Sequence, residues 1–364
     1  MLGGGQLGRM LGLAGLPLGL EFTFLDPSPD ATAAAVGDLV VGELDDLAAA
    51  AQAAAGATVV TYEWEGVPAG TARALAQRVT VLPSARALEV SQDRLVEKQT
   101  FRSLGIATAP FRPVDDRPSL DAAIAELGLP AVLKTRRGGY DGKGQAVLRS
   151  AGDADSAWAA LGGVPLILEG FVPFDRELSI VGVRARDSGE IACWTAVENT
   201  HVDGMLRLTR APAPDLDAAL QTNAEACIRP LFESLDFVGV GCVELFQVGD
   251  ELLANEMAPR VHNSGHWTIE GAETSQFENH LRAVLGWSLG STATRSVSAM
   301  VNCIGGMPDV RAVLQTPGTH PHDYAKAPRA GRKVGHVTVV ATGPEQLQAR
   351  LASVQALVGA ATVG

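Results

Sequence analysis

Cysteine is scarce in this chain and shows no pairing pattern. Cys193, Cys227, Cys242 and Cys303 are the only four, and no two of them form a C-x-x-C pair. The spacing therefore gives no sign of a disulfide framework or of a cysteine-based metal site. We expect four reduced thiols in the core of an intracellular protein.

Long apolar runs are also missing. No segment approaches the roughly 18 to 20 apolar residues that a helix needs to cross a bilayer. Arg9 and the apolar stretch from Met10 to Leu20 superficially resemble a signal peptide, but Pro17 and several glycines interrupt it and Glu21 ends it. We expect a cytoplasmic protein that has no membrane partner.

Positive charge is in short supply. The formal net charge is -12, which argues against a general nucleic-acid binder, because affinity for the phosphate backbone comes from clustered Lys and Arg. Any anion site must therefore be local. The chain has only five lysines, and Lys134, Lys143 and Lys333 all fall in the polar motifs described below, while Lys98 lies close to a further candidate.

What the chain does contain is a normal globular composition. It has 364 residues, of which 46% are hydrophobic and 19% charged. This length predicts two or three domains, with enough buried apolar surface to fold without disulfide or metal staples.

The pattern of elements changes along the chain, which predicts a mixed α/β and α+β fold. Up to residue 83, short β-like runs at Phe22 to Leu25 and Thr58 to Tyr62 alternate with a helix at Leu44 to Ala55, as in a parallel sheet covered by helices. We expect a helical connection over 84–118, containing a helix from Ser91 to Leu104. The next strands are closer together and joined by short Gly or Asp turns, which favours antiparallel pairing. They are expected at Ala131 to Thr135, Gln145 to Leu148, Leu166 to Phe171, Glu177 to Val183, Ile191 to Val197, Val238 to Gln247 and Glu251 to Met257.

We divide the chain on this basis into an N-terminal domain over 1–83, a central domain over 84–290 and a C-terminal domain over 291–364. Within the central domain a small subdomain is expected over about 119–172 and a larger sheet over 173–290. The C-terminal domain is expected to contain a strand from Ser296, a strand at His336 to Val340 and a helix from Glu345.

A glycine loop opens the chain. Gly3, Gly5 and Gly8 satisfy G-x-G-x-x-G ahead of a helix, and Asp26 ends the next strand where a ribose-binding acid would lie. Such a loop can hold a phosphate on its backbone N–H groups, and a nicotinamide-dependent dehydrogenase is one alternative. Only Met1 and Leu2 precede the glycines, so the expected first strand is nearly missing.

A second glycine loop, K-T-R-R-G-G-Y-D-G-K-G-Q, spans 134–145 and carries four basic residues and four glycines around Asp141. Glycine allows close approach to a ligand, and the cations neutralise phosphate charge. It is not a Walker A loop, because Lys143 precedes Gly144 rather than Ser or Thr. A solvated hairpin is the alternative.

Two glutamates suggest a metal site. Glu244 and Glu256 lie on consecutive predicted strands joined through Gly249 and Asp250, so a hairpin brings them nearly opposite each other. Like charges across a ladder repel, and Mg²⁺, which uses one or two carboxylates plus phosphates and water, removes that penalty. Asn255 supplies a further oxygen. The alternative is that Arg260 or another cation pairs with these acids.

Further polar clusters point towards one cleft. Arg260, His262, Asn263 and His266 follow the second glutamate, and the two histidines lack the remaining ligands of a zinc site. Three other groups are expected in loops or at strand ends: Glu63 and Glu65 after one strand, Glu198, Asn199 and His201 after another, and Arg329, Arg332, Lys333 and His336 near the C-terminus.

Five of these motifs together resemble the 5-(carboxyamino)imidazole ribonucleotide synthase family of ATP-grasp enzymes. They are G-G-G-Q-L-G-R-M at 3–10, T-Y-E-W-E at 61–65, R-R-G-G-Y-D-G-K-G-Q at 136–145, N-E-M-A-P-R-V-H-N-S-G-H-W-T at 255–268 and G-R-K-V-G-H at 331–336. The resemblance runs in order over nearly the whole chain. It implies an ATP-grasp fold with an N-terminal Rossmann-like domain and a small β-rich C-terminal domain.

The resemblance also implies roles for individual residues. ATP would contact Arg94, Lys134, Gly139, Tyr140, Asp141, Gly142, Lys143, Gly144, Gln145, Glu169, Gly170, Phe171, Val172, Glu177, His201, Asn255 and Glu256. Glu244 and Glu256 would hold Mg²⁺, with Mn²⁺ as a substitute. Gln6, Arg332 and Lys333 would bind the ribotide phosphate. The aminoimidazole and bicarbonate would be surrounded by Glu65, Tyr140, Asp141, Arg260, His262 and Asn263, with Lys333 also near the chemistry.

The implied reaction joins bicarbonate to 5-aminoimidazole ribonucleotide at the expense of ATP, through carboxyphosphate, in purine biosynthesis. Closure of the 136–145 loop would exclude water from that short-lived intermediate. The resemblance also implies a homodimer. Within the resemblance, another ATP-grasp carboxylate-amine ligase is the alternative. Two other classes stay open from the residues alone: the dehydrogenase, and a nucleotide-responsive binding module without turnover.

Overall fold

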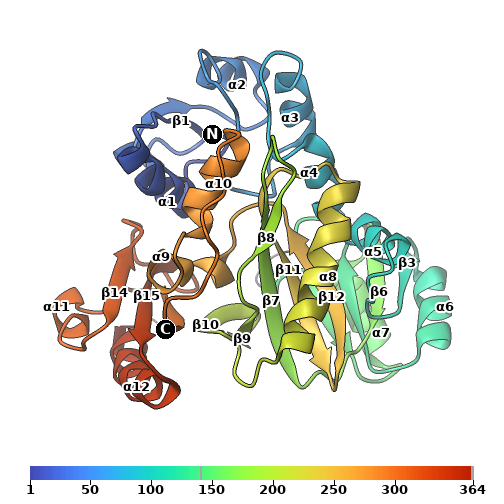
Figure 1. The fold of residues 1–364 in the computed structure, drawn as a ribbon. Helices are drawn as coiled ribbons and strands as arrows, with labels where there is room; N and C mark the ends of the chain where they lie inside the picture. Colours follow the sequence, from blue (N-terminus) through green and yellow to red (C-terminus); the bar gives the residue numbers. More distant parts are fainter. Residues whose placement is uncertain (140–141, 362–364) are drawn as a thin grey trace.

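The computed structural model describes residues 1–139 and 142–361. The N-terminal part is a small α/β unit in which two strands pair in parallel, with Thr23 opposite Asp38. Helices cover the pair (Figure 1). Its elements are α1 (Gln6–Gly15), β1 (Thr23–Asp26), β2 (Asp38–Val41), α2 (Leu47–Ala53) and α3 (Ala69–Leu75).

The nearly missing first strand is present as a single position. Leu2 forms parallel bridges to both Leu25 and Tyr62, and its N–H donates to the Thr61 carbonyl at 2.8 Å. Leu2 therefore fills the place between β1 and the Tyr62 segment and supports the glycine loop. The strand expected from Thr58 to Tyr62 was too long, because only Val60 and Tyr62 form isolated bridges.

A helical connection leads into a separate four-stranded antiparallel sheet, which lies at the right in Figure 1. Two helices connect strands of this sheet, and apolar residues of the strands and of both helices pack into one core. The elements are α4 (Ala85–Ser91), α5 (Arg94–Ser103), β3 (Phe111–Val114), α6 (Arg117–Leu127), β4 (Ala131–Thr135), β5 (Gln145–Leu148), α7 (Asp153–Leu161) and β6 (Leu166–Gly170). The strand order is β3-β6-β4-β5.

The largest sheet runs through the rest of the chain, in the order β12-β11-β7-β9-β10-β13-β15-β14, with β8 beside β7. Its first part contains β7 (Arg176–Arg184), β8 (Ile191–Cys193), β9 (Val197–Val202), β10 (Met205–Ala211), β11 (Gly239–Val248) and β12 (Glu251–Ala258). The buried face of α8 (Ala218–Ser234) packs on this part of the sheet. The single strand expected from Ile191 to Val197 is in fact two, β8 and the beginning of β9.

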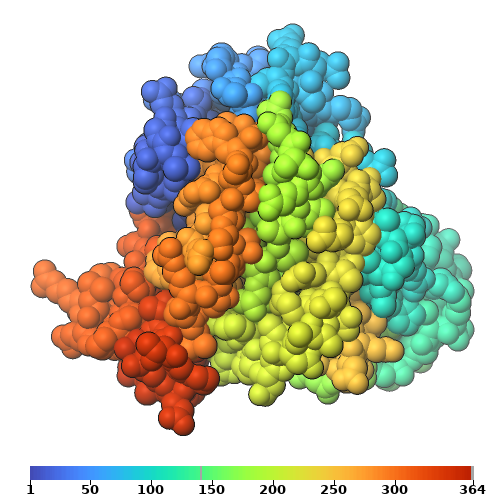
Figure 2. Space-filling model, in the orientation of Figure 1, coloured from blue at the N-terminus to red at the C-terminus, as the bar shows by residue number. Residues whose placement is uncertain are grey.

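The C-terminal strands extend the same sheet, because β10 pairs with β13 in antiparallel register, Leu208 opposite Val301. The elements here are α9 (Thr268–Gly271), α10 (Gln276–Val284), β13 (Val297–Ile304), α11 (Val310–Val313), β14 (Thr319–Asp323), β15 (Lys333–Ala341) and α12 (Pro344–Ala361). Figure 2 shows the N-terminal part at the top, the C-terminal part at the lower left and the four-stranded sheet at the right, packed into one body. No helix in the described ranges is long and apolar enough to span a membrane.

Candidate active site

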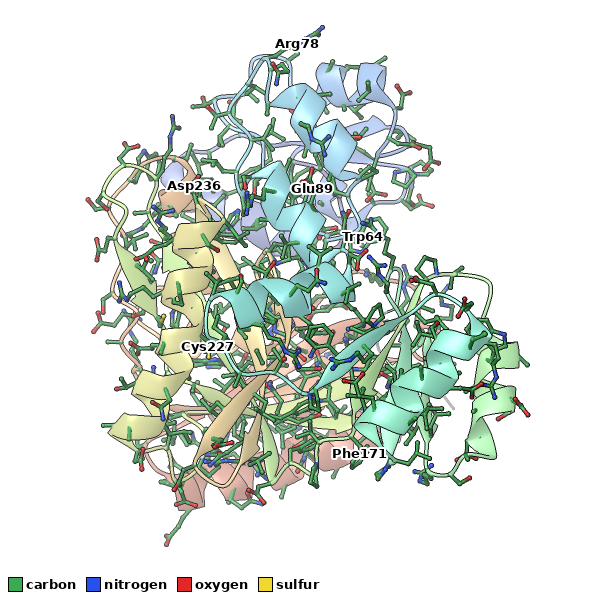
Figure 3. All side chains as sticks on the ribbon, turned by 90° about the vertical axis from the view of Figure 1, so that its right-hand side faces the viewer. Trp64, Arg78, Glu89, Phe171, Cys227 and Asp236 are labelled. Atoms are coloured by element: carbon green, nitrogen blue, oxygen red, sulfur yellow. The ribbon has the colours of Figure 1, made fainter. Side chains whose placement is uncertain are left out.

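One large cavity of about 1300 Å³ lies where these parts meet. Its walls come from the N-terminal part, the four-stranded sheet, the large sheet and the C-terminal loop before β15. Figure 3 shows two of its lining side chains, Trp64 in the N-terminal part and Phe171 just after β6. A cavity formed by four segments far apart in sequence can bind several ligands at once.

Most residues singled out from the sequence line this cavity. They are Gln6, Glu65, Arg94, Lys134, Gly139, Gly142, Lys143, Gln145, Glu169, Gly170, Phe171, Val172, Glu177, His201, Glu244, Asn255, Glu256, Arg260, His262, Asn263, Arg332 and Lys333. Gly144 does not line it; instead its carbonyl accepts from Thr135 N–H at 2.8 Å, which closes the β4–β5 hairpin. Tyr140 and Asp141 lie outside the described residues, so their predicted roles stay predictions.

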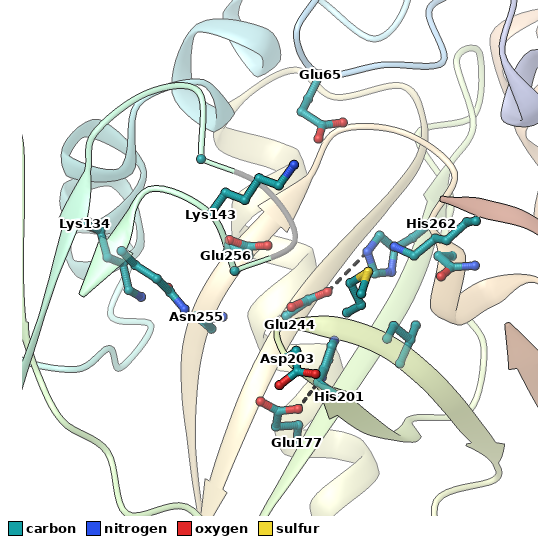
Figure 4. A pocket seen from close by; sticks show the side chains of 18 of the residues that line it. Glu65, Lys134, Lys143, Glu177, His201, Asp203, Glu244, Asn255, Glu256 and His262 are labelled. Atoms are coloured by element: carbon teal, nitrogen blue, oxygen red, sulfur yellow. Dashed lines mark hydrogen bonds and ion pairs between the residues drawn. The ribbon is translucent and has the colours of Figure 1, made fainter. Parts of the chain in front are cut away.

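The two glutamates of the predicted hairpin face each other. Glu244 on β11 is the direct antiparallel partner of Glu256 on β12, and a bulge follows this pair. The turn between the strands contains Gly249 at φ +57°, a left-handed conformation that favours glycine. Figure 4 shows both carboxylates in the middle of the cavity.

Both glutamates have cationic partners, but Arg260 is not one of them. Arg94 on α5 donates to the Glu256 carboxylate at 2.7 Å, and His262 Nε2 lies 3.2 Å from Glu244 Oε1. Arg260 instead pairs with Glu65. The alternative of charge pairing is thus present in this structure with other cations, and a metal ion would have to compete with them.

Electrostatics at this centre favour charged forms. Burial opposes ionisation of Glu244, but its hydrogen bond to His262 and the nearby positive charges lower the pKa of Glu244 to about 2. Burial by itself lowers the pKa of His262, yet the Glu244 carboxylate beside it raises the pKa above its ordinary value. The Ser264 N–H donates to His262 Nδ1 at 3.3 Å, so the ring nitrogen that carries the proton and faces Glu244 is Nε2.

The donor set fits a hard divalent cation. Asn255 lines the cavity between the two glutamates in sequence, and its Oδ1 is buried without a hydrogen-bond partner among the described residues. Two carboxylates and one orphaned amide oxygen are the ligand type that Mg²⁺ prefers, the remaining positions being taken by phosphate and water. The described residues contain no group of three His, Cys, Asp or Glu side chains that could hold a metal by themselves.

A buried ion-pair group anchors the four-stranded sheet to α5. Glu169 on β6 accepts from Lys134 on β4 at 2.9 Å and lies 3.4 Å from Lys98 on α5. Burial alone raises the pKa of Glu169, but the two ammonium groups outweigh it and hold the pKa at about 2. Glu169 Oε1 has no described partner, so one oxygen of this carboxylate is available at the cavity wall.

Glu177 and His201 form an ion pair on neighbouring strands, as Figure 4 shows. Burial lowers the pKa of His201, while the hydrogen bond to Glu177 raises it, and the net effect is a raised pKa. The expectation that Glu198, Asn199 and His201 lie in a loop after a strand was wrong, because all three are inside β9. The run Val-Glu-Asn-Thr-His-Val is polar, and its neighbours β7 and β10 hold it in the sheet.

The first glycine loop binds protein carboxylates instead of a ligand phosphate. Gly5 N–H and Gly8 N–H donate to the Glu63 carboxylate at 2.6 and 2.7 Å, and Gly4 N–H donates to Asp26 at 2.8 Å. These three amides are therefore occupied by protein carboxylates, and Asp26 is hydrogen-bonded to the loop. This contradicts the interpretation of Gly3, Gly5, Gly8 and Asp26 as a dinucleotide site.

One basic residue at the C-terminal wall of the cavity, Lys326, was not expected from the sequence, whereas Arg329 was. Lys326 and Arg329 line the cavity beside Arg332 and Lys333, and Lys326 Nζ donates to Gln6 Oε1. Lys326 ties the Gln6 loop to the C-terminal part. The signal that could have revealed it was the scarcity of lysine, because Lys326 is the one lysine of five to which we gave no interpretation.

The opposite end of the cavity is apolar. Val132 and Val147 from the small sheet line it together with Phe174 and Phe246. The two phenylalanine rings stack with their centroids 4.6 Å apart. A flat aromatic base fits such a wall. From one end to the other, the cavity therefore has an apolar wall, an acidic centre and a basic wall.

Three family models match the chain. An ATP-grasp domain model matches residues 99–277, a ribonucleotide synthetase preATP-grasp domain model matches 1–92, and a phosphoribosylaminoimidazole carboxylase C-terminal domain model matches 298–350. A curated relative from Pseudomonas aeruginosa, N5-carboxyaminoimidazole ribonucleotide synthase, is 53% identical over 360 residues, which cover 99% of each chain. This chain belongs to the N5-carboxyaminoimidazole ribonucleotide synthase family.

Other members of the synthase family agree. The relative from Brucella melitensis is 46% identical and covers 93% of this chain and 94% of its own. The crystal structure of the synthetase from Thermus thermophilus superposes with a TM-score of 0.95 at 58% identity, over 98% of this chain and 97% of that one. A synthase from Aspergillus clavatus in complex with ADP and 5-aminoimidazole ribonucleotide superposes with a TM-score of 0.92 at 32% identity, over 99% and 97%. The ATP-grasp architecture expected from the sequence is confirmed.

Proposed function

We propose that this chain carboxylates 5-aminoimidazole ribonucleotide with bicarbonate, consuming ATP and producing N5-carboxyaminoimidazole ribonucleotide, ADP and phosphate in purine biosynthesis. One observation carries the proposal: a single cavity joins an apolar wall, a pair of facing glutamates and a basic end. The A. clavatus synthase binds ADP and this ribotide together, and the cavity here is large enough for both.

The nucleotide belongs at the apolar and acidic side. Its base would lie against Val132, Val147 and Phe246, and Lys134 and Arg94 would meet its phosphates. Glu244, Glu256 and Asn255 would hold Mg²⁺, or Mn²⁺ in its place. A bound divalent ion neutralises phosphate charge and orients the transferred group.

The ribotide belongs at the basic side. Gln6, Arg332 and Lys333 would bind its phosphate, and Lys326 and Arg329 add charge to the same wall. Arg260 is oriented by Glu65 and, with His262 and Asn263, would position bicarbonate and the exocyclic amine. An oxygen of bicarbonate would attack the γ-phosphate, and the resulting carboxyphosphate would then pass its carboxyl group to the amine while phosphate leaves.

Asn263 is held firmly for such a role. Its Nδ2 donates to Asn302 Oδ1 at 3.1 Å, and Asn302 Nδ2 donates back to Asn263 Oδ1 at 2.7 Å. Asn302 Nδ2 also donates to the Leu206 carbonyl at 2.8 Å. The C-terminal strand β13 thereby fixes Asn263. The proposed ribotide site therefore depends on the C-terminal part of the chain.

Release of phosphate from ATP tests the proposal. With Mg²⁺ and bicarbonate present, adding 5-aminoimidazole ribonucleotide should raise the rate of phosphate release by at least about tenfold, because the ribotide completes the site. Equal release with and without the ribotide would contradict the proposal. ATP binding without any product would instead support the nucleotide-responsive binding module.

The family resemblance also leads us to propose a homodimer. The chain has a mass of 37.8 kDa, so sedimentation equilibrium should give twice that mass at micromolar concentration. A monomer at that concentration would contradict the proposed dimer but would not bear on the proposed reaction.

A further inference from the structure

Gln276, the first residue of α10, is fully buried and holds the loop that carries His262. The His262 N–H donates to Gln276 Oε1 at 2.8 Å, and Gln276 Nε2 donates to the His262 carbonyl at 2.7 Å. If the amide were rotated by 180°, its NH₂ group would face the His262 N–H and its oxygen would face the His262 carbonyl oxygen. Neither hydrogen bond could then form. The backbone of His262 therefore determines which end of this amide is nitrogen.

The same amide nitrogen determines the tautomer of a second histidine, His266. Gln276 Nε2 lies 3.1 Å from His266 Nδ1. An amide NH₂ group only donates, so Nδ1 must accept and carries no proton. The proton of a neutral His266 is therefore on Nε2.

His266 lies buried at the wall of the cavity. Its side chain is almost completely enclosed, 1% exposed, yet it lines the cavity. Because Nδ1 is turned to Gln276, Nε2 is the ring nitrogen left for the cavity. Phe277 and His336 pack beside the ring at centroid distances of 5.4 and 5.0 Å, so the ring has little freedom to turn.

The surroundings keep His266 neutral. Burial lowers the pKa of His266 well below its ordinary value, and the positive charges of Lys333 and Arg260 lower it further. The ring is thus a single, fixed N–H donor among cations. An oxygen acceptor on an anionic ligand fits such a place better than any donor does.

We propose that His266 binds an oxygen of the ribotide substrate through Nε2–H, and that Gln276 is the positioning residue that fixes this tautomer. The inference rests on the proposed function for the identity of the ligand. The tautomer itself rests only on the contacts of Gln276. The two parts can therefore fail separately.

The tautomer is measured on the wild-type protein. Nitrogen NMR of protein labelled with ¹⁵N-histidine separates protonated from unprotonated ring nitrogens, and His266→Gln identifies the signals of this one among seven histidines. We expect a protonated Nε2 and an unprotonated Nδ1 at pH 7, with the Nε2 signal moving when ribotide is added. A protonated Nδ1 would overturn the proposal.

Kinetics test the contact with the ribotide. His266→Leu should raise the KM for the ribotide by roughly tenfold to a hundredfold, as expected for loss of one hydrogen bond to a charged acceptor, and leave the KM for ATP within about twofold. His266→Gln, whose amide nitrogen can take the place of Nε2, should recover most of that loss. An equal rise in both KM values, or no rise in either, would overturn the contact.

Gln276→Glu tests the positioning role. Its carboxylate cannot donate to Nδ1, so the ring should change tautomer or become protonated, and the KM for the ribotide should rise. Gln221→Glu is the matched control, because Gln221 braces the backbone in the same way: it accepts from Ala196 N–H at 2.8 Å and donates to the Trp194 carbonyl at 3.2 Å. The control should lose stability but keep both the His266 signals and the KM for the ribotide; identical behaviour of the two variants would overturn the role of Gln276.

If the wild type shows no ribotide-dependent turnover while the NMR gives the expected tautomer, the proposed function fails and the assignment of the tautomer stands. If turnover is present and the tautomer is the other one, only this inference fails.

Discussion

Glu256 already forms an ion pair with Arg94, and a metal ion would have to displace this arginine. Arg94 donates to its carboxylate at 2.7 Å, and Oδ1 of the adjacent Asn255 is buried with no hydrogen-bond partner within 1–139 and 142–361. A divalent ion bound with ATP would take over the carboxylate, and we expect Arg94 then to turn towards the phosphates. The ion pair would keep the like charges of Glu244 and Glu256 compatible before the nucleotide arrives.

Glu256→Gln tests this residue. The amide keeps the shape but removes the charge that would hold the metal, so we expect kcat to fall by two to three orders of magnitude, about 3 to 4 kcal/mol of transition-state stabilisation. Steady-state phosphate release at saturating ribotide measures it. A loss under about tenfold would remove Glu256 from the metal site.

Glu198→Gln is the control for that variant. Glu198 is also a strand glutamate held by arginines, Arg176 at 3.3 Å and Arg210 at 3.2 Å, but it does not line the cavity as described. Its kcat should stay within about threefold of the wild type.

At the level of single residues, the sequence identified those that stand in dense polar motifs. Arg260 and His262 were found because they belong to the dense polar run just past Glu256. Lys326 was missed because Ala and Pro surround it, and only the fold brings it to Gln6. The partner of the first glycine loop was misjudged for the same reason: Glu63 is 55 residues from Gly8 in sequence, and its carboxylate lies on the loop only after folding.

Among the elements, α5 holds the two sides of the cavity together. Arg94 reaches β12 through Glu256, and Lys98 reaches β6 through Glu169. Asp93 caps the helix by accepting from Leu95 N–H at 3.1 Å, and it also binds Arg136, just beyond β4, with two contacts at 2.9 and 2.8 Å. One turn of helix therefore sets the position of the small sheet relative to the large one.

Asp93→Asn should separate capping from anchoring. Asparagine can still cap the helix, but it cannot form the charged two-point contact with Arg136. We expect the free energy of unfolding to fall by about 1 to 3 kcal/mol and the KM for ATP to rise. Urea unfolding and initial-rate kinetics measure the two effects.

Asp116→Asn is the matched control, because Asp116 caps α6 by accepting from Ser119 N–H at 2.8 Å and has no described cation partner. It should change the KM for ATP very little. The same rise in KM for both variants would contradict the anchoring role of Asp93.

Strands with a clear local signal were predicted to the residue, as β4 and β5 were. Their short apolar runs and the glycines between them specify these strands locally. The hairpin of β9 and β10 was missed because β9 is a polar strand, and its place is determined by pairing with β7 and β10 rather than by its own residues.

For the whole molecule, the large sheet is continuous from the ATP-grasp strands into the C-terminal part through β10 and β13. The division at 83 and 290 remains our proposal, and limited proteolysis that cuts first near those positions would support it. The sequence indicated the strands on either side but not this pairing, because β10 itself was not expected.

Acid should weaken the fold through Glu169. Its pKa in the folded state is about 2, below the ordinary value of 4.5, so the folded state binds fewer protons than the unfolded state. The stabilisation is complete above about pH 4.5 and is lost as the pH falls towards 2. Glu169→Gln should lose about 3 to 5 kcal/mol at pH 7, because two buried ammonium groups lose their partner.

The difference in unfolding free energy between Glu169→Gln and the wild type should therefore shrink as the pH falls below 4.5. Urea unfolding at pH 7, 5, 4 and 3 measures this. A difference that does not change with pH would show that Glu169 is not the ionised partner of Lys98 and Lys134.

The reaction itself is tested most directly by mass spectrometry of both products, with bicarbonate labelled by ¹³C and ¹⁸O and times short compared with oxygen exchange. If bicarbonate attacks ATP and the ribotide amine then takes the carboxyl group, the ribotide product carries ¹³C and the released phosphate carries one ¹⁸O. Phosphate without ¹⁸O, or a ribotide without ¹³C, would contradict the account.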